Sequence, residues 1–163
     1  MDKTNNPTYL ATISQIDVGA TYIQQLFDYY HQCLLSSEWA CVFIEQAAHI
    51  PDDLKEHSFP CLCTRSLITQ VPSRRTLVGG AIRGRLQQEG LLLGNGGEFF
   101  RGCVVFPETN ENGVIVSAIG YRFGKRIRRG RPAVIQWQRT EPNLMLSKAM
   151  NKIQEVIHEK ANF

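Results

Sequence analysis

The fold is decided by residues 99–123, which read FFRGCVVFPETNENGVIVSAIGYRF. Apolar, β-branched and aromatic residues fill the two halves of this stretch, 99–106 and 114–123, and Asn112-Gly113 lies between them. An Asn-Gly pair between two such runs is typical of a tight hairpin turn. We therefore expect two antiparallel strands here.

Working outward, the segment Ala133-Val134-Ile135-Gln136-Trp137 predicts a third strand, joined to the second by a connection over 124–132. Together with the hairpin, this strand makes an antiparallel meander over residues 98–139. Beyond it, Thr140 is a candidate N-cap and Pro142 suits a first turn, which predicts a last helix near 142–160.

Upstream, Asp17 is a good N-cap for a helix over 18–35, whose apolar residues recur at steps of three and four. Residues 39–44 have no helical periodicity, so we favour a buried strand there over a helix. Pro51 begins a short helix that ends near His57, and residues 61–71 are expected to be extended. A turn at Gly79-Gly80 opens a helix that Gly90 closes.

These elements predict an α+β fold, an antiparallel β-meander packed by an N-terminal and a C-terminal helix. The chain of 163 residues fits one domain, which we place at 8–163 after a flexible N-terminus at 1–7. Its 43% apolar and 20% charged residues are close to globular averages, which argues against a disordered or fibrous protein.

The start of the chain is polar and no apolar run is long enough to cross a bilayer, so we expect a cytoplasmic protein with no membrane partner. Its five cysteines are odd in number and irregularly spaced, which predicts free thiols. Cys61 and Cys63, with His49 and His57 nearby, lack the second cysteine pair of a tetrahedral zinc site. We expect neither a metal nor a cofactor.

Charge is unevenly distributed along the chain. Residues 1–71 hold three basic and eight acidic residues, a net of −5, whereas residues 72–163 hold fifteen basic and seven acidic residues, a net of +8. Asymmetry of this kind indicates a polyanionic partner.

The strongest local signal is the stretch 121–132, in which six of twelve residues are cationic and which lies in a run without acids from 112 to 140. The six residues are Arg122, Lys125, Arg126, Arg128, Arg129 and Arg131. Most of them fall on the predicted connection between two strands, as a basic finger whose guanidinium forks match phosphate oxygens. Residues 129–132 resemble the core of the AT-hook, but strand-like sequence flanks them, so no A·T preference follows.

A second basic segment follows Ser73 and carries Arg74, Arg75, Arg83 and Arg85 around the pair Gly79-Gly80. Glycines that open a helix leave backbone N–H groups for an anion, or they allow close packing of the helix on a sheet. Tyr121 and Phe123 adjoin the finger and are candidates for stacking on bases, although strand alternation equally places both in the core.

These patterns favour a small non-catalytic nucleic-acid-binding protein that uses the basic finger on phosphates of DNA or RNA, with the second segment as a further patch. A second hypothesis is a regulatory protein–protein adaptor or inhibitor whose finger docks on an acidic partner surface. A third is an enzyme with an anionic small-molecule substrate at Gly79-Gly80. The histidines lie near no nucleophile motif, so we assign no catalytic residue.

Overall fold

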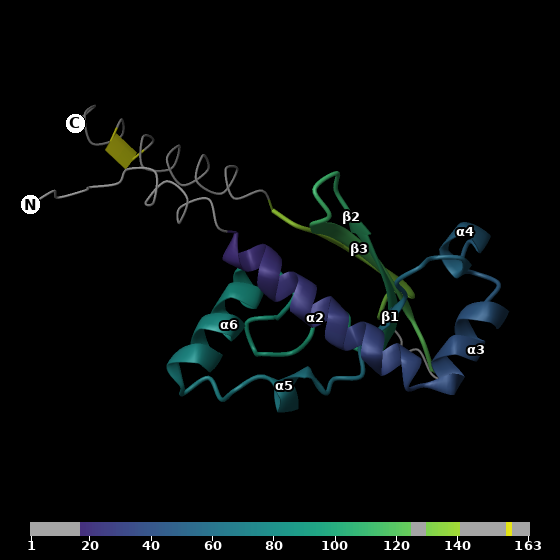
Figure 1. Cartoon of the computed structure of the whole chain (residues 1–163), viewed down its shortest axis with the longest axis horizontal. Coiled ribbons are helices and arrows are strands. Elements are labelled where there is room, and N and C mark those ends of the chain that lie inside the picture. The colour runs from purple at the N-terminus through teal and green to yellow at the C-terminus, as the bar shows by residue number, and fades with distance from the viewer. Residues whose placement is uncertain (1–16, 125–129, 141–155, 158–163) are drawn as a thin grey trace, which may run out of the picture.

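The computed structural model describes residues 17–124, 130–140 and 156–157 (Figure 1). In chain order its elements are α2 (Val18–Leu35), α3 (Glu38–Gln46), α4 (Asp52–Lys55), β1 (Cys61–Leu62), α5 (Leu67–Gln70), α6 (Leu77–Gln88), β2 (Cys103–Thr109), β3 (Ile115–Arg122) and β4 (Val134–Gln138). The fold is therefore α+β. Residues 1–7 and most of the predicted helix at 142–160 lie outside the described residues.

The four strands form one antiparallel sheet in the order β1-β2-β3-β4. The hairpin between β2 and β3 turns at the predicted place, where Gly113 has a φ of +75° and Asn110 accepts backbone hydrogen bonds from residues 112 and 114. The meander predicted from the sequence is confirmed, and β1 adds a short strand to its edge.

Helix α2 begins where the sequence predicts, because the Asp17 carboxylate accepts a hydrogen bond from the Ala20 amide at 3.0 Å. Its buried residues pack on one face of the sheet, against Val105 and Trp137 among others. The opposite face, which carries Val104 and Phe106, is covered by α3 and the segment that follows it. The sheet thus lies between helices on both faces.

Residues 39–44 are helical, so the predicted strand there is wrong. Ser37 caps α3 by accepting from the Ala40 amide at 3.2 Å, and Ala40 and Ile44 are buried one turn apart. The helical spacing of the buried residues is not visible in the sequence, because Trp39 and Val42 are apolar although both are exposed.

Two strand boundaries also differ from the prediction. Only Cys61–Leu62 of the segment 61–71 is a strand, and α5 follows it. Strand β2 starts at Cys103 rather than at residue 99, since Phe99 and Phe100 lie in a turn that packs on the core. It continues through Pro107 to Thr109.

One ion network joins the end of the meander to the helices. The Arg139 guanidinium, whose side chain is 6% exposed, forms a fork on Asp17 at 2.7 and 2.8 Å and contacts the buried Glu89 carboxylate at 3.1 Å. The Trp137 indole donates to the Glu89 carbonyl at 2.6 Å. These contacts attach the end of β4 to the start of α2 and the end of α6.

Replacing Arg139 with Ala should lower the free energy of unfolding by about 3 kcal/mol, because it leaves the buried Glu89 carboxylate with a weaker partner. Urea denaturation measures this decrease. Arg131→Ala, at an exposed position, is the control and should change the value by less than about 0.5 kcal/mol. Equal midpoints for the two variants would contradict the role given to Arg139.

The same network predicts a pH dependence. Hydrogen bonds from Arg139 hold the pKa of Asp17 below its ordinary value of 3.8, so the native state releases this proton more readily than the unfolded chain. Asp17 therefore stabilises the fold fully above its unfolded pKa, and this contribution is lost as the pH falls through its native pKa. Between about pH 5 and pH 2 the parent should lose stability more steeply than Asp17→Asn; parallel curves would disprove this.

Candidate nucleic-acid interface

Three chain segments meet at one end of the sheet, where β1 ends, β2 begins and β3 ends. The Gly102 amide donates to the Cys63 carbonyl at 3.1 Å, and the Phe123 amide donates to the Gly102 carbonyl at 3.0 Å. These bonds bring Arg65, Arg101 and Arg122 to the same end, and Arg131 follows on the far side of the connection to β4. We call these four arginines the cationic end.

Arg122 holds the cationic end together. Its Nε donates to the Pro132 carbonyl at 2.8 Å and its Nη1 donates to the Arg101 carbonyl at 3.3 Å. Both bonds go to neutral carbonyls, so the positive charge of Arg122 is retained. The connection from β3 to β4 leaves the sheet and returns to it at this end. Gly124 and Gly130 are the described residues on either side of its undescribed part, 125–129.

Arg65 and Arg101 were not identified from the sequence, because both are far from Arg122 along the chain and come to the same end of the sheet only through strand pairing. The Arg101 Nε is buried without a hydrogen-bond partner among the described atoms. Arg65 is exposed and has a φ of 72°, a backbone conformation that favours glycine. The described residues include no ion pair to any arginine of the cationic end.

The second basic segment is not brought to the cationic end. Helix α6 packs near the start of α2 (Figure 1). The Arg85 side chain lies beside Gly19 there, whereas Phe123 lines a hollow together with Cys33, near the end of α2. Arg74 and Arg75 are exposed beside α6. The two predicted patches are thus separate surfaces.

Two arginines of the second segment have structural partners. Arg83 donates to the carbonyls of Ile68, Val71 and Pro72 at 3.0 to 3.2 Å, so it fixes the chain before α6. The Arg85 Nε lies 3.5 Å from Glu89. Both side chains therefore take part in the packing of α6 and do not form a row of unpaired charges.

Gly79 and Gly80 lie in the first turn of α6. The Gly79 amide donates to the Thr76 hydroxyl at 3.0 Å and the Gly80 amide donates to the Thr76 carbonyl at 2.9 Å. A Cβ on Gly79 would clash with the Pro72 and Ser73 carbonyls. Gly79 is therefore closely packed, but against the preceding chain rather than against the sheet, and neither amide is left available to an anion.

The two aromatic residues beside the finger have different environments. Tyr121 is 4% exposed and packs edge-on against Phe106, so its ring belongs to the core, and burial raises the pKa of its hydroxyl. Phe123 is half-buried and lies against the exposed Trp39, with the ring centroids 4.7 Å apart. Of the two, Phe123 therefore belongs to the more accessible surface, whereas the buried Tyr121 borders a cavity on the same face of the sheet.

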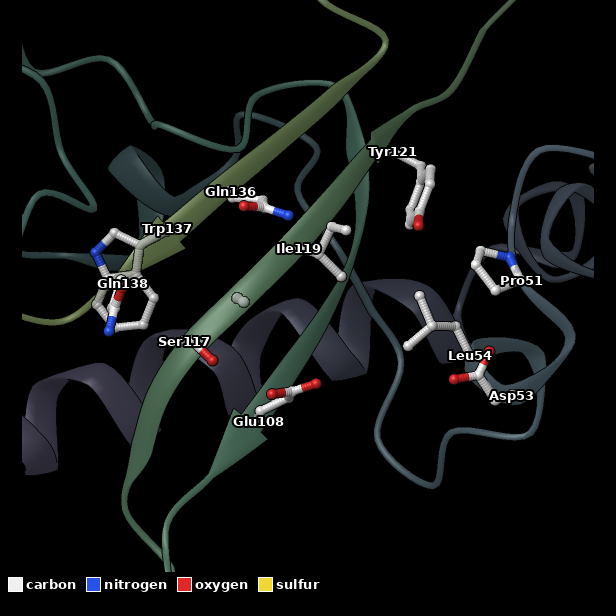
Figure 2. Close-up of a pocket in the computed structure, with 11 residues that line it drawn as sticks. Pro51, Asp53, Leu54, Glu108, Ser117, Ile119, Tyr121, Gln136, Trp137 and Gln138 are labelled. Carbon is white, nitrogen blue, oxygen red and sulfur yellow. The ribbon is translucent and has the colours of Figure 1, made fainter.

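A cavity of about 620 Å³ lies on the sheet face that α3 and α4 cover in part (Figure 2). Ile119 and Gln136 of the sheet face Leu54 across it, and its charged groups are the carboxylates of Asp53 and Glu108. Negative charge of this kind repels phosphates. None of the four arginines of the cationic end lines this cavity, so the two are distinct surfaces.

The cysteine and histidine residues do not converge. Cys61 and Cys63 lie in the core beside α2, whereas the His57 Nε2 donates to the Pro107 carbonyl at 2.8 Å and His49 packs edge-on against Phe43. Among the described residues no group of three or more His, Cys, Asp or Glu side chains is placed to hold a metal ion. Within those same residues, no helix is long and apolar enough to span a membrane.

No protein-family model matches the chain, and no curated protein matches it in sequence. Its fold is similar to solved primase structures. The chain aligns over 76% of its length with 39% of the DnaG catalytic core, at 16% identity and a TM-score of 0.58. It also aligns over 79% of its length with 32% of the Aquifex aeolicus primase zinc-binding and RNA polymerase domains, at 15% identity and a TM-score of 0.57.

A third similar structure is the DnaG primase catalytic domain bound to ssDNA, matched over 76% of this chain and 39% of that one, at 15% identity and a TM-score of 0.54. The chain thus spans less than two fifths of each of these structures. At sequence identities of 15–16%, the similarity to these structures is a similarity of fold alone.

The thiols give a direct test of the packing at this site. Burial raises the pKa of Cys63 to about 12 and that of Cys103 to about 11, and it also raises the pKa of Cys61. Because the thiolate is the reactive form, these three should resist iodoacetamide at about pH 8, and the half-buried Cys33 and Cys41 should react first. Mass mapping of the native protein checks the order; early modification of Cys63 would contradict it.

Proposed function

We propose that this protein binds single-stranded nucleic acid through the cationic end of the sheet, as a binding protein rather than a catalyst. The observation that carries the proposal is the meeting of Arg65, Arg101 and Arg122 where the finger leaves the sheet. Guanidinium groups fork onto phosphate oxygens, and release of counterions supplies the affinity.

The charge of the finger supports this proposal. Lys125, Arg126, Arg128 and Arg129 lie between Gly124 and Gly130, outside the described residues, and no acid occurs from 112 to 140. A strand bound at the cationic end would therefore meet further cations along the connection. The groups gathered there are suited to holding phosphates and bases rather than to proton transfer, because arginine keeps its charge at all working pH values.

The fold likeness supports a nucleic-acid partner, since the similar structures are primase cores and one of them is described as bound to ssDNA. We take a single strand as the ligand for that reason. An acidic protein surface is the competing partner for the same charges, and a binding experiment separates the two.

The first test compares two double variants that each remove two positive charges. Arg65→Asn with Arg131→Gln alters the cationic end, and Arg74→Gln with Arg75→Gln alters the exposed segment before α6. Asn is chosen at residue 65 because it tolerates a positive φ. Binding of a fluorescent dT12 strand, a dT12-dA12 duplex and a U12 RNA is measured by anisotropy over a salt series.

The variant at the cationic end should bind dT12 more weakly, and its logarithmic salt slope should flatten by about 0.7 for each phosphate that the protein no longer neutralises. The Arg74 and Arg75 variant should bind like the parent. Replacing Arg126, Arg128, Arg129 and Arg131 together with Gln should weaken binding further with little change in stability, because exposed charges contribute within about 0.5 kcal/mol each. A parent protein that binds none of the strands, and instead retains an acidic protein, would overturn the proposal.

A further inference from the structure

At the end of the sheet that carries the cationic end, the exposed Trp39 and the half-buried Phe123 form an aromatic pair. Their ring centroids are 4.7 Å apart with an interplanar angle of 51°, and Phe43 supports Phe123 edge-on at 5.4 Å. The Phe123 backbone is fixed by its hydrogen bond to Gly102. The Phe123 ring is therefore held in place by Phe43, and the Trp39 ring is accessible from solvent.

Trp39 does not belong to the core of the fold. Helix α3 buries Ala40 and Ile44, and Trp39 lies on the flank of that stripe with 56% of its surface exposed. The other tryptophan of the chain, Trp137, is 6% exposed and has its indole hydrogen-bonded. A large, rigid, exposed ring next to a second ring is a surface on which a base can stack.

A hollow of about 480 Å³ adjoins the pair, with Phe123 in its wall. Tyr29 and Leu62 contribute apolar surface, and Gln32 and Thr64 contribute polar groups that can reach a base edge. Two of its lining residues, Thr64 and Phe123, are chain neighbours of Arg65 and Arg122. The hollow and the cationic end therefore lie at the same end of the sheet, within reach of one bound strand.

We propose that Trp39 and Phe123 are a base-stacking site, on which an unpaired base of the bound strand lies while its phosphates contact the cationic end. This inference rests on the proposed function and adds to it the residues that recognise the base. A duplex keeps its bases stacked on one another, so the site favours a single strand. Stacking is tolerant of sequence, because every base has a π-face.

The experiment uses tryptophan emission of the full chain. Trp137 is buried and gives a constant background, so quenching by a ligand reports on Trp39. The probes are dT12 and an abasic 12-mer with the same phosphates and no bases. The variants are Trp39→Ala and, as the control at an exposed apolar residue on α6, Leu77→Ala, at a position that is 91% exposed.

We expect dT12 to quench the emission of the parent and of Leu77→Ala, and the abasic strand to bind without quenching. Trp39→Ala should lose the quenching and bind dT12 about tenfold more weakly, because a base stacked on an aromatic residue contributes strongly to affinity. Its affinity for the abasic strand should equal that of the parent. Comparing the two probes on the parent alone also tests the inference, without any variant.

Two results would overturn the inference, and they differ in what they say about the proposed function. If the parent binds dT12 but shows no more quenching than with the abasic strand, or if Trp39→Ala binds dT12 as the parent does, the stacking site is wrong and the proposed function stands. If the parent binds no strand at all, both are wrong.

Discussion

The fork between Arg139 and Asp17 is the contact on which the arrangement of sheet and helices depends. Arg139 ends the meander, Asp17 starts α2 and Glu89 ends α6, so one guanidinium joins three elements that are distant in sequence. Gly19 lies beside it, where a Cβ would be 2.5 Å from the Glu89 carboxylate and would displace that side chain from the network. With the sheet fixed along α2 at this end, its other end lies near the C-terminal part of α2 (Figure 1), where Phe123 and Cys33 line one hollow.

The parts of the fold that follow from local chemistry could be predicted from the sequence. The Asp17 cap, the Asn112-Gly113 hairpin and the strands of the meander depend on neighbours along the chain, and the structure has them close to the expected places, apart from the later start of β2 at Cys103. The helix at Glu38–Gln46 could not be predicted in this way, because the exposed Trp39 and Val42 are apolar and make the apolar run continuous.

The candidate site shows the same division between local and long-range information. The run of arginines and the aromatic residues beside it can both be recognised in the sequence. The partners that complete the site, Arg65, Arg101 and Trp39, come from three other segments and meet Arg122 and Phe123 only through strand pairing and helix packing. Conversely, Arg83 looks like a free charge in the sequence, but three backbone carbonyls bind it.

The central claim is that nucleic acid binds at this end of the sheet rather than along α6. Hydrogen exchange of the full chain, with and without saturating dT12, tests it most directly because it maps the bound surface without any substitution. We expect slower exchange in residues 36–43, 63–66 and 101–103 and around 121–133, with no change over 72–88. Slower exchange over 72–88, and none at the end of the sheet, would contradict it.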